Sequence, residues 1–146
     1  MFERIVVGLD GSQVSETALR TGAELAQRLD LPIHLVRVAD LAVVPWGASE
    51  AAEAYAELSG EMVREQEKAT QYLETVAQPL RDEGLAVTTE VRSGFAAREL
   101  SEAAGPEDLL VVASQGRHGI ARLVLGSVAE EVAKRSRASV LIAKGS

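Results

Sequence analysis

Short apolar runs alternate with longer segments of helical periodicity along this 146-residue sequence. The apolar runs have the length and composition of strands and span residues 5–9, 33–38, 85–91, 109–113 and 139–143. The segments between them repeat apolar residues at helical spacing and span residues 18–29, 49–83, 95–104 and 127–135. Strands that alternate with helices require right-handed crossovers. The pattern therefore predicts a single α/β domain, a five-stranded parallel sheet covered by helices on both faces.

The segment 49–83 is the longest of the helical stretches. Its apolar stripe consists of Tyr55, Leu58, Met62, Ala69, Leu73, Val76 and Leu80. Glutamates occupy the other positions, which is typical of a solvated helix face. Gly60 and Pro79 argue against one unbroken helix, because glycine weakens a helix interior and proline lacks a backbone donor. Gly84 has the position of a helix C-cap.

The composition limits the possible partners. The chain has 22 acidic and 15 basic residues, a net charge of −7, and only 3% aromatic residues. Nucleic-acid binding needs phosphate neutralisation and base stacking, so neither DNA nor RNA is an expected partner. The absence of cysteine excludes disulfides and thiolate chemistry. The first apolar run comes too early for a signal peptide, and no run approaches the ~18 residues of a membrane span, so we expect a cytoplasmic protein without a membrane partner.

The charge is unevenly distributed along the chain. Residues 115–146 contain six basic and two acidic residues, a balance of +4, whereas residues 1–114 carry −11. A local positive balance next to glycines favours a small bound anion. Lys134, Arg135 and Arg137 fit a plainer role, since cations suit the end of a helix. Arg117, His118 and Arg122 lie in or beside a glycine loop and remain open to either role.

In a parallel sheet of this kind, ligands bind beyond the carboxyl ends of the strands. The segments at those ends are 8–12, 38–40, 92–94 and 113–119. The last of these leads through a glycine loop to Gly126 and Ser127, where a helix is expected to begin. Glycines allow the backbone to approach an anion closely, and a helix N-terminus favours negative charge. Ser127 and Glu130 also have the spacing of a capping box, and a serine can both cap a helix and contact a ligand.

Taken together, these motifs resemble the universal stress protein family in its nucleotide-binding branch. The family pattern is Gly, two residues, Gly, nine residues, Gly and then Ser or Thr. Gly116, Gly126 and Ser127 match it, while Ala113 replaces the first glycine. The stretches 5–12, 35–38 and 126–130 also resemble the family, and the likeness covers nearly the whole chain.

The resemblance implies a Rossmann-like fold with strand order 3-2-1-4-5 that binds ATP, together with Mg or Mn. Asp10 would lie by the ribose and adenine, the backbone of Val38 would pair with the adenine edge, and the main chain of Val112 and Ala113 would follow the ribose. The phosphates would be held by Gly116, Gly126, Ser127 and Val128. The remaining candidates for the same site are Gly8, Ser12, Arg117 and His118. A carboxylate accepts hydrogen bonds from ribose hydroxyls but repels phosphates, so Asp10 belongs at the sugar end of the nucleotide.

Two of these positions have alternative interpretations. Asp10 also fits a turn whose serine, Ser12, caps the first helix. The methyl group of Ala113 could crowd the ligand or forbid a positive φ, whereas it costs nothing if the local φ is negative. A blocked pocket would favour an ATP-independent member of the same fold that acts through protein partners.

The sequence does not favour an enzyme. It lacks the Gly-x₄-Gly-Lys-[Ser/Thr] loop of P-loop NTPases, and Arg92 to Gly94 stand where a response regulator needs its acceptor aspartate. No acid–base pair, activated nucleophile or histidine cluster is evident. We therefore expect a nucleotide-binding regulatory protein with at most slow ATP hydrolysis.

The family resemblance also implies a homodimer. In the family's strand order the last strand, Ser139–Ala143, lies at a sheet edge. An apolar edge strand is an aggregation liability unless it is paired. We therefore predict that Ser139–Ala143 pairs with its twin across a two-fold axis.

Overall fold

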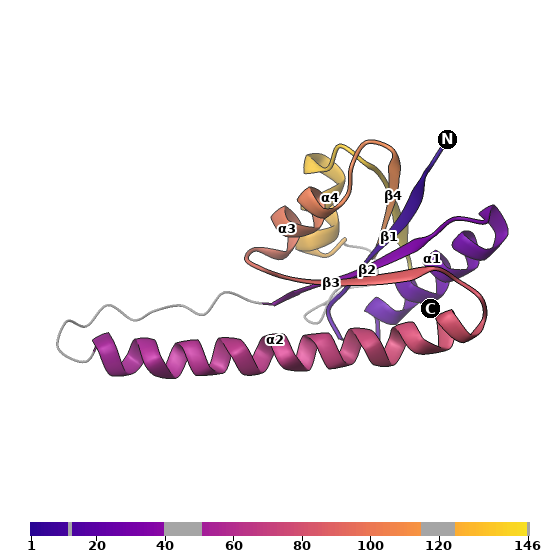
Figure 1. The fold of residues 1–146 in the computed structure, drawn as a ribbon. Helices are drawn as coiled ribbons and strands as arrows, with labels where there is room; N and C mark the ends of the chain where they lie inside the picture. The colour runs from indigo at the N-terminus through magenta and orange to yellow at the C-terminus, as the bar shows by residue number, and fades with distance from the viewer. Residues whose placement is uncertain (12, 40–50, 115–124, 146) are drawn as a thin grey trace.

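The computed structural model describes residues 1–11, 13–39, 51–114 and 125–145, with the side chains of residues 51–59 excepted. The strands are β1 (Arg4–Leu9), β2 (Ile33–Ala39), β3 (Val87–Ser93), β4 (Asp108–Ala113) and β5 (Ser139–Ala143). The helices are α1 (Ser15–Leu29), α2 (Ala51–Asp82), α3 (Ala96–Ala103) and α4 (Ser127–Arg135). Strands and helices alternate as the periodicity predicts (Figure 1).

The five strands form one parallel sheet in the order β3-β2-β1-β4-β5, which confirms the predicted fold class and strand order. The central strand β1 pairs with β2 on one side, where Leu9 stands opposite Arg37, and with β4 on the other, where Val7 stands opposite Val111. The chain therefore moves outward from β1 to β3 and then crosses to β4. The carboxyl ends of β1 and β4 meet at the point where this direction reverses.

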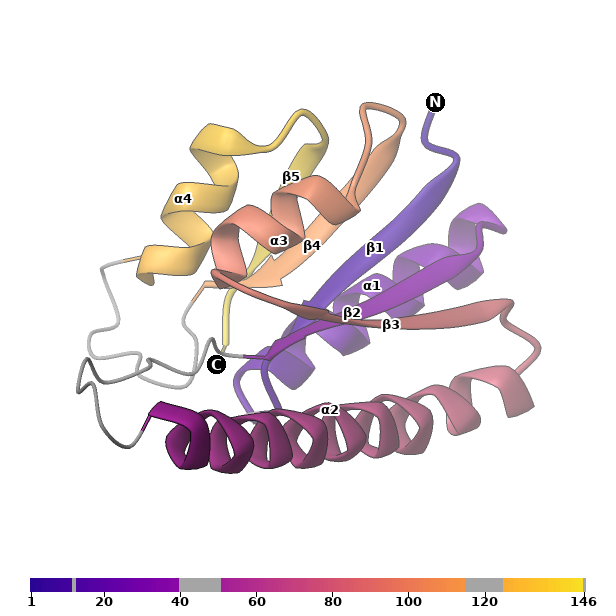
Figure 2. The same cartoon turned by 60° about the vertical axis from the view of Figure 1, so that its left-hand side comes forward.

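Each face of the sheet carries its own core. Ile5, Val7 and Val111 pack with α1 and α2, and Val6 and Leu110 pack with α3 and α4. Figure 2 shows the two helix pairs on opposite faces of the sheet. Side chains alternate between faces along a strand, so β1 and β4 are buried on both sides and consist almost wholly of aliphatic residues.

The segment 51–82 is one unbroken helix, so the expectation that Gly60 and Pro79 would interrupt it is wrong. Pro79 lies in the last turn, where few helical bonds remain to be broken, and Leu73 and Ala77 are fully buried against the sheet. The predicted cap is confirmed. Gly84 has a φ of 95°, and its N–H donates to the Arg81 carbonyl while the next N–H donates to the carbonyl of Leu80, the pattern of a Schellman motif.

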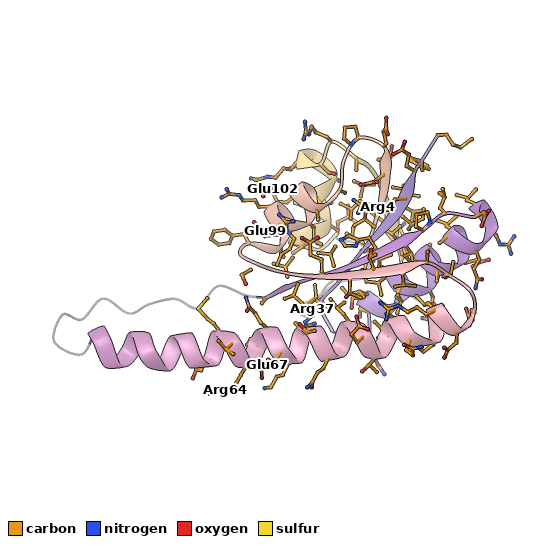
Figure 3. The ribbon with its side chains drawn as sticks, viewed as in Figure 1. Arg4, Arg37, Arg64, Glu67, Glu99 and Glu102 are labelled. Atoms are coloured by element: carbon orange, nitrogen blue, oxygen red, sulfur yellow. The ribbon has the colours of Figure 1, made fainter. Side chains whose placement is uncertain are left out.

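The N-terminal part of α2 extends beyond the sheet (Figure 1). Residues 61–68 are exposed on every side of the helix, and Figure 3 shows Arg64 and Glu67 on this part. The predicted apolar stripe is therefore buried only toward the C-terminus. Ala69 is buried, whereas Met62 is 38% exposed and the side chains of Tyr55 and Leu58 lie outside the described residues. None of the described helices combines the length and the apolar character that a membrane span requires.

Candidate functional site

A pocket opens at the carboxyl ends of β1 and β4, the switch point of the sheet. It contains about 510 Å³ of space, part of it open to solvent. The lining residues come from the strand ends, from the start of α1 and from α3 and α4. They are Gly8, Leu9, Asp10, Ser15, Val38, Ala96, Leu100, Val112, Ala113, Val128 and Ala129.

The floor of the pocket depends on the missing side chain of Gly8. A Cβ atom at this position would lie 2.9 Å from both methyl groups of Leu100 and 3.4 Å from Cγ1 of Val112. The glycine therefore allows α3 to pack directly on β1. Leu100, Val112 and the neighbouring Val38 all belong to the core on the α3/α4 face. This part of the pocket is apolar and suits a flat, weakly polar group.

Asp10 and Ser15 supply the polar side chains of the pocket. The backbone N–H of Asp10 donates to Oγ of Ser15 over 3.3 Å, and Ser15 is only 3% exposed. This bond ties the end of β1 to the first residue of α1. A carboxylate at such a position accepts hydrogen bonds from hydroxyl groups.

The N-terminus of α4 forms another side of the pocket. Gly126 is the N-cap residue, and its N–H donates to the Ser114 carbonyl over 2.7 Å, which joins the end of α4 to the end of β4. The first helical bond runs from the Glu130 N–H to the Gly126 carbonyl. The backbone N–H groups of Ser127 and Val128 therefore precede the helical ladder and are oriented for an anion.

The predicted capping box at Ser127 is wrong. Ser127 is the first helical residue, not the N-cap, and among the described residues no side-chain cap hydrogen bond is found here. The Glu130 side chain instead accepts a hydrogen bond from Lys134 at 3.1 Å, an i,i+4 ion pair on the exposed face. Arg135 forms a similar ion pair with Glu131. Both cations thus lie on the exposed face in the last turn of α4, as expected for side chains that suit a helix end.

The first helix is also predicted to have a serine cap. α1 begins at Ser15, and its N-cap residue Val14 makes no side-chain cap hydrogen bond. Ser12 itself lies outside the described residues. Ser15 takes part in the turn instead, through its bond to Asp10.

Ala113 does not crowd the pocket with its methyl group. The side chain packs against the core on the α1/α2 face, whereas Val112 packs on the pocket face. The backbone of Ala113 lies along the pocket and continues the regular pairing of β4 with β5. Asp30 is the only described residue other than glycine with a positive φ, so Ala113 carries no such strain.

The structure brings six of the predicted site residues together in the pocket: Gly8, Asp10, Val38, Val112, Ala113 and Val128. Gly126 and Ser127 adjoin them at the start of α4. Ser12, Gly116, Arg117 and His118, as well as Arg122, lie outside the described residues. Five lining residues were not predicted: Leu9, Ser15, Ala96, Leu100 and Ala129. Four of these have apolar side chains like those of ordinary core residues, so the sequence does not distinguish them. Only Ser15, a polar residue soon after Asp10, could have been identified as a site residue from the sequence.

The model of the universal stress protein family matches residues 1–144 of the chain. The chain belongs to this family. Universal stress protein MJ0531 of Methanocaldococcus jannaschii is 32% identical over 99% of the chain and 83% of its own length. Universal stress protein YxiE of Bacillus subtilis is 28% identical over 99% of the chain and its full length. A family member from Mycolicibacterium smegmatis is 32% identical, but the chain spans only 48% of it.

Solved structures share this architecture. The structure of hypothetical protein MJ0577 superposes with a TM-score of 0.82 at 24% identity and covers 100% of the chain and 98% of its own. A universal stress protein in complex with cAMP superposes with a TM-score of 0.67 at 25% identity, covering 97% of the chain and 96% of its own. The described residues therefore have the fold seen in these structures.

Proposed function

We propose that this universal stress protein binds ATP and acts as a regulatory nucleotide-binding protein. The observation that carries the proposal is the joining of three features in one pocket: an apolar floor, a carboxylate at one end and the N-terminus of α4 at another. An adenine nucleotide has the matching parts, a flat base, a ribose with hydroxyl donors and a chain of anionic phosphates.

The pocket suggests a role for each part of the site. The base would occupy the apolar region beside Val38, Leu100 and Val112. The Asp10 carboxylate would accept hydrogen bonds from the ribose hydroxyls, and the N–H groups at the start of α4 would hold the phosphates. Support also comes from the relative crystallised with cAMP, another adenine nucleotide.

We further propose that Mg or Mn accompanies the ATP. The described residues contain no group of three acidic, histidine or cysteine side chains that would hold a metal. Mg²⁺ commonly binds through substrate phosphates and few protein carboxylates, so the nucleotide would supply most ligands. The ion would then neutralise phosphate charge, and binding of ATP would weaken when EDTA removes it.

Catalysis is not expected to be the main activity. Asp10 is the one ionisable side chain among the described lining residues, and a single carboxylate provides no acid–base pair. We propose at most slow hydrolysis of ATP. A phosphate-release assay that gave turnover on the order of 10 s⁻¹, the median of ordinary enzymes, would contradict this.

Isothermal titration of the protein with ATP and Mg²⁺ tests the proposal. We expect binding that Asp10→Asn weakens about tenfold, the effect of losing one charge-assisted hydrogen bond. Asp30→Asn is the matched control. It makes the same chemical change at the far end of α1, where the left-handed backbone tolerates asparagine, and is expected to bind as the wild type does. Absence of binding at millimolar ATP would refute the proposal and favour the ATP-independent alternative.

We also propose that the protein is a homodimer formed through β5. The two edges of the sheet differ in character. The edge strand β3 carries Glu90 and Arg92, and charges of this kind discourage strand pairing, whereas β5 is apolar and its central residues are only partly buried. Light scattering at micromolar concentration is expected to give twice the 15.5 kDa chain mass. A monomer mass would count against pairing.

The cytoplasm remains the proposed location of the protein. A chain without cysteine needs no oxidising compartment. Fractionation of cells that express the tagged protein tests this, and recovery with the membrane fraction would contradict it.

A further inference from the structure

Arg37 lies on the opposite face of the sheet from the pocket, at the level of the turn that carries Asp10. It stands opposite Leu9, the last residue of β1, in the β1–β2 register. Val36 and Val38 pack on the α3/α4 face, and side chains alternate along a strand, so Arg37 points toward α2. Figure 3 shows it between the sheet and this helix.

Two contacts hold the Arg37 guanidinium. Its Cζ atom lies 5.3 Å from the centre of the Tyr72 ring on α2, a distance at which cation and ring attract each other. The guanidinium also occupies the space beside Gly11 that a side chain would need. A Cβ atom at Gly11 would overlap Nη1 of Arg37 and lie 3.2 Å from its Cζ atom. Gly11 has a φ of 85°, which glycine adopts without strain. Arg37 is therefore wedged between α2 and the turn after β1.

Several charges surround the wedge. Burial raises the pKa of the Tyr72 phenol above its ordinary value, the charges of Glu16 and Asp10 raise it further, and the charge of Arg37 opposes them. Two carboxylates and one guanidinium thus lie within electrostatic range of one hydroxyl group.

Stability alone gives a poor account of this arrangement. Nε and Nη1 of Arg37 are buried and have no hydrogen-bond partner among the described residues. Burying polar groups without hydrogen bonds is costly, and the few that native proteins keep call for an explanation. One explanation is that the guanidinium is needed where it lies, against Gly11 and one residue from Asp10.

We propose that Arg37 is a positioning residue for the nucleotide pocket: held on the Tyr72 ring, it fixes the turn at Gly11 so that the Asp10 carboxylate faces the ligand. The identity of that ligand rests on the proposed function, whereas the effect on the turn does not. Arg37 acts from the far face of the sheet and influences the ligand only through Asp10.

Comparing the affinities for two nucleotides tests whether Arg37 influences the ligand through Asp10. ATP offers both ribose hydroxyls to Asp10, and 2′,3′-dideoxy-ATP offers neither. Arg37→Ala is expected to weaken ATP binding about tenfold, the effect of one misplaced charge-assisted hydrogen bond, and to change dideoxy-ATP binding less than about twofold. Arg37→Lys keeps the charge and is expected to restore part of the affinity. In an Asp10→Asn background, Arg37→Ala is expected to have no further effect.

The ring on α2 provides a matched pair of variants. Tyr72→Leu removes the surface on which the guanidinium rests and is expected to reproduce the pattern of Arg37→Ala. Tyr72→Phe keeps the ring and is expected to bind both nucleotides as the wild type does.

Amide hydrogen exchange without nucleotide gives a readout that does not depend on ligand binding. The Asp10 N–H is bonded to Ser15, so Arg37→Ala is expected to speed its exchange several-fold. The Leu85 N–H, bonded to the Leu80 carbonyl at a distant helix end, is the internal control for a general loss of stability.

The outcomes separate the two proposals. Equal weakening of both nucleotides, or an Asp10 amide as protected as in the wild type, overturns the role of Arg37. If the wild type binds no ATP but Arg37→Ala speeds exchange at Asp10 and not at Leu85, the proposed function fails and the positioning of the turn by Arg37 stands.

Discussion

Gly8→Ala is expected to lower the stability of the protein and to disturb the proposed nucleotide pocket. The added methyl group would lie 2.9 Å from both Cδ atoms of Leu100, and ordinary carbon–carbon contacts begin near 3.5 Å, so Leu100 must move by roughly 0.6 Å or more. Overpacking of this kind costs about 1–3 kcal/mol, offset by about 0.4–1 kcal/mol because alanine restricts the unfolded chain. We therefore expect a net loss of about 1–2 kcal/mol, or about 3–8 °C in Tm.

Urea unfolding and ATP titration together check this prediction. Leu100 lines the pocket, so its displacement is expected to weaken ATP binding about fivefold, which corresponds to about 1 kcal/mol. The variant Leu100→Ala removes the clashing atoms, at a cost of about 2–5 kcal/mol by itself. In the double variant, Gly8→Ala is expected to cost less than it does alone by about 1 kcal/mol, because the new methyl group then enters a cavity.

Gly22→Ala is the matched control for this experiment. A Cβ atom at Gly22 would lie 2.5 Å from Cγ2 of Val7, an even closer contact on the other face of the sheet. It is expected to lower stability while ATP affinity stays within about twofold of the wild type. If Gly8→Ala unfolds at the wild-type urea concentration, or if its cost is unchanged by Leu100→Ala, the account of the pocket floor is refuted.

Three further predictions follow from other parts of the structure. At the start of β4, Arg4 and the Gly105 N–H donate hydrogen bonds to the Asp108 carboxylate. Burial raises the pKa of this carboxyl group, but the hydrogen bonds and the charge of Arg4 outweigh burial and lower the pKa overall. The ionised carboxylate therefore stabilises the fold above about pH 4, and this contribution is lost as the pH falls through the lowered pKa. Asp108→Asn is accordingly expected to lower the free energy of unfolding by about 1–3 kcal/mol at pH 7, and by less as the pH falls below 4, as measured by urea unfolding across pH. ATP affinity, measured by titration, is expected to stay unchanged. Ala113→Gly is expected to lower stability by about 0.5–1 kcal/mol without raising ATP affinity, since the methyl group faces away from the pocket, and a gain in affinity would contradict this. In a Tyr55→Phe background, absorbance titration is expected to show Tyr72 ionising above its ordinary pKa, and Arg37→Ala is expected to raise that pKa further; a downward shift would refute the assigned charges.

The fold was largely predictable because its determinants are local. The aliphatic composition of β1 and β4 predicts strands buried on both faces, and the alternation with helices predicts a parallel sheet. The boundaries were less accessible. β3 begins at Val87, two residues later than predicted, because Leu85 is still needed to complete the cap of α2. The burial of Met62 was misjudged because periodicity shows which side of a helix is apolar but not where the sheet beneath it ends.

The start of α4 shows a second limit. Sequence spacing suggests that Ser127 caps this helix, yet Gly126 takes the N-cap position. Cap preferences amount to about 1 kcal/mol, and the connections at strand ends can override them. At α4, the bond from the Gly126 N–H to the carbonyl of Ser114 fixes the chain one residue before the predicted cap. The position of the helix start, and with it the direction of the free N–H groups, is thus set by a contact with β4.

The glycines at the end of β1 show why the site itself needs three dimensions. Gly8 lies within the predicted strand and Gly11 in the turn that follows it, and the space that each leaves is filled by a side chain from elsewhere in the chain. Gly8 makes room for Leu100 on the pocket face, and Gly11 makes room for Arg37 on the other face. Asp10 lies between them, so side chains on opposite sides of the sheet both limit where its carboxylate can be. Arg37 does not line the pocket, yet by the proposal made above it helps to place the Asp10 carboxylate from the other face of the sheet.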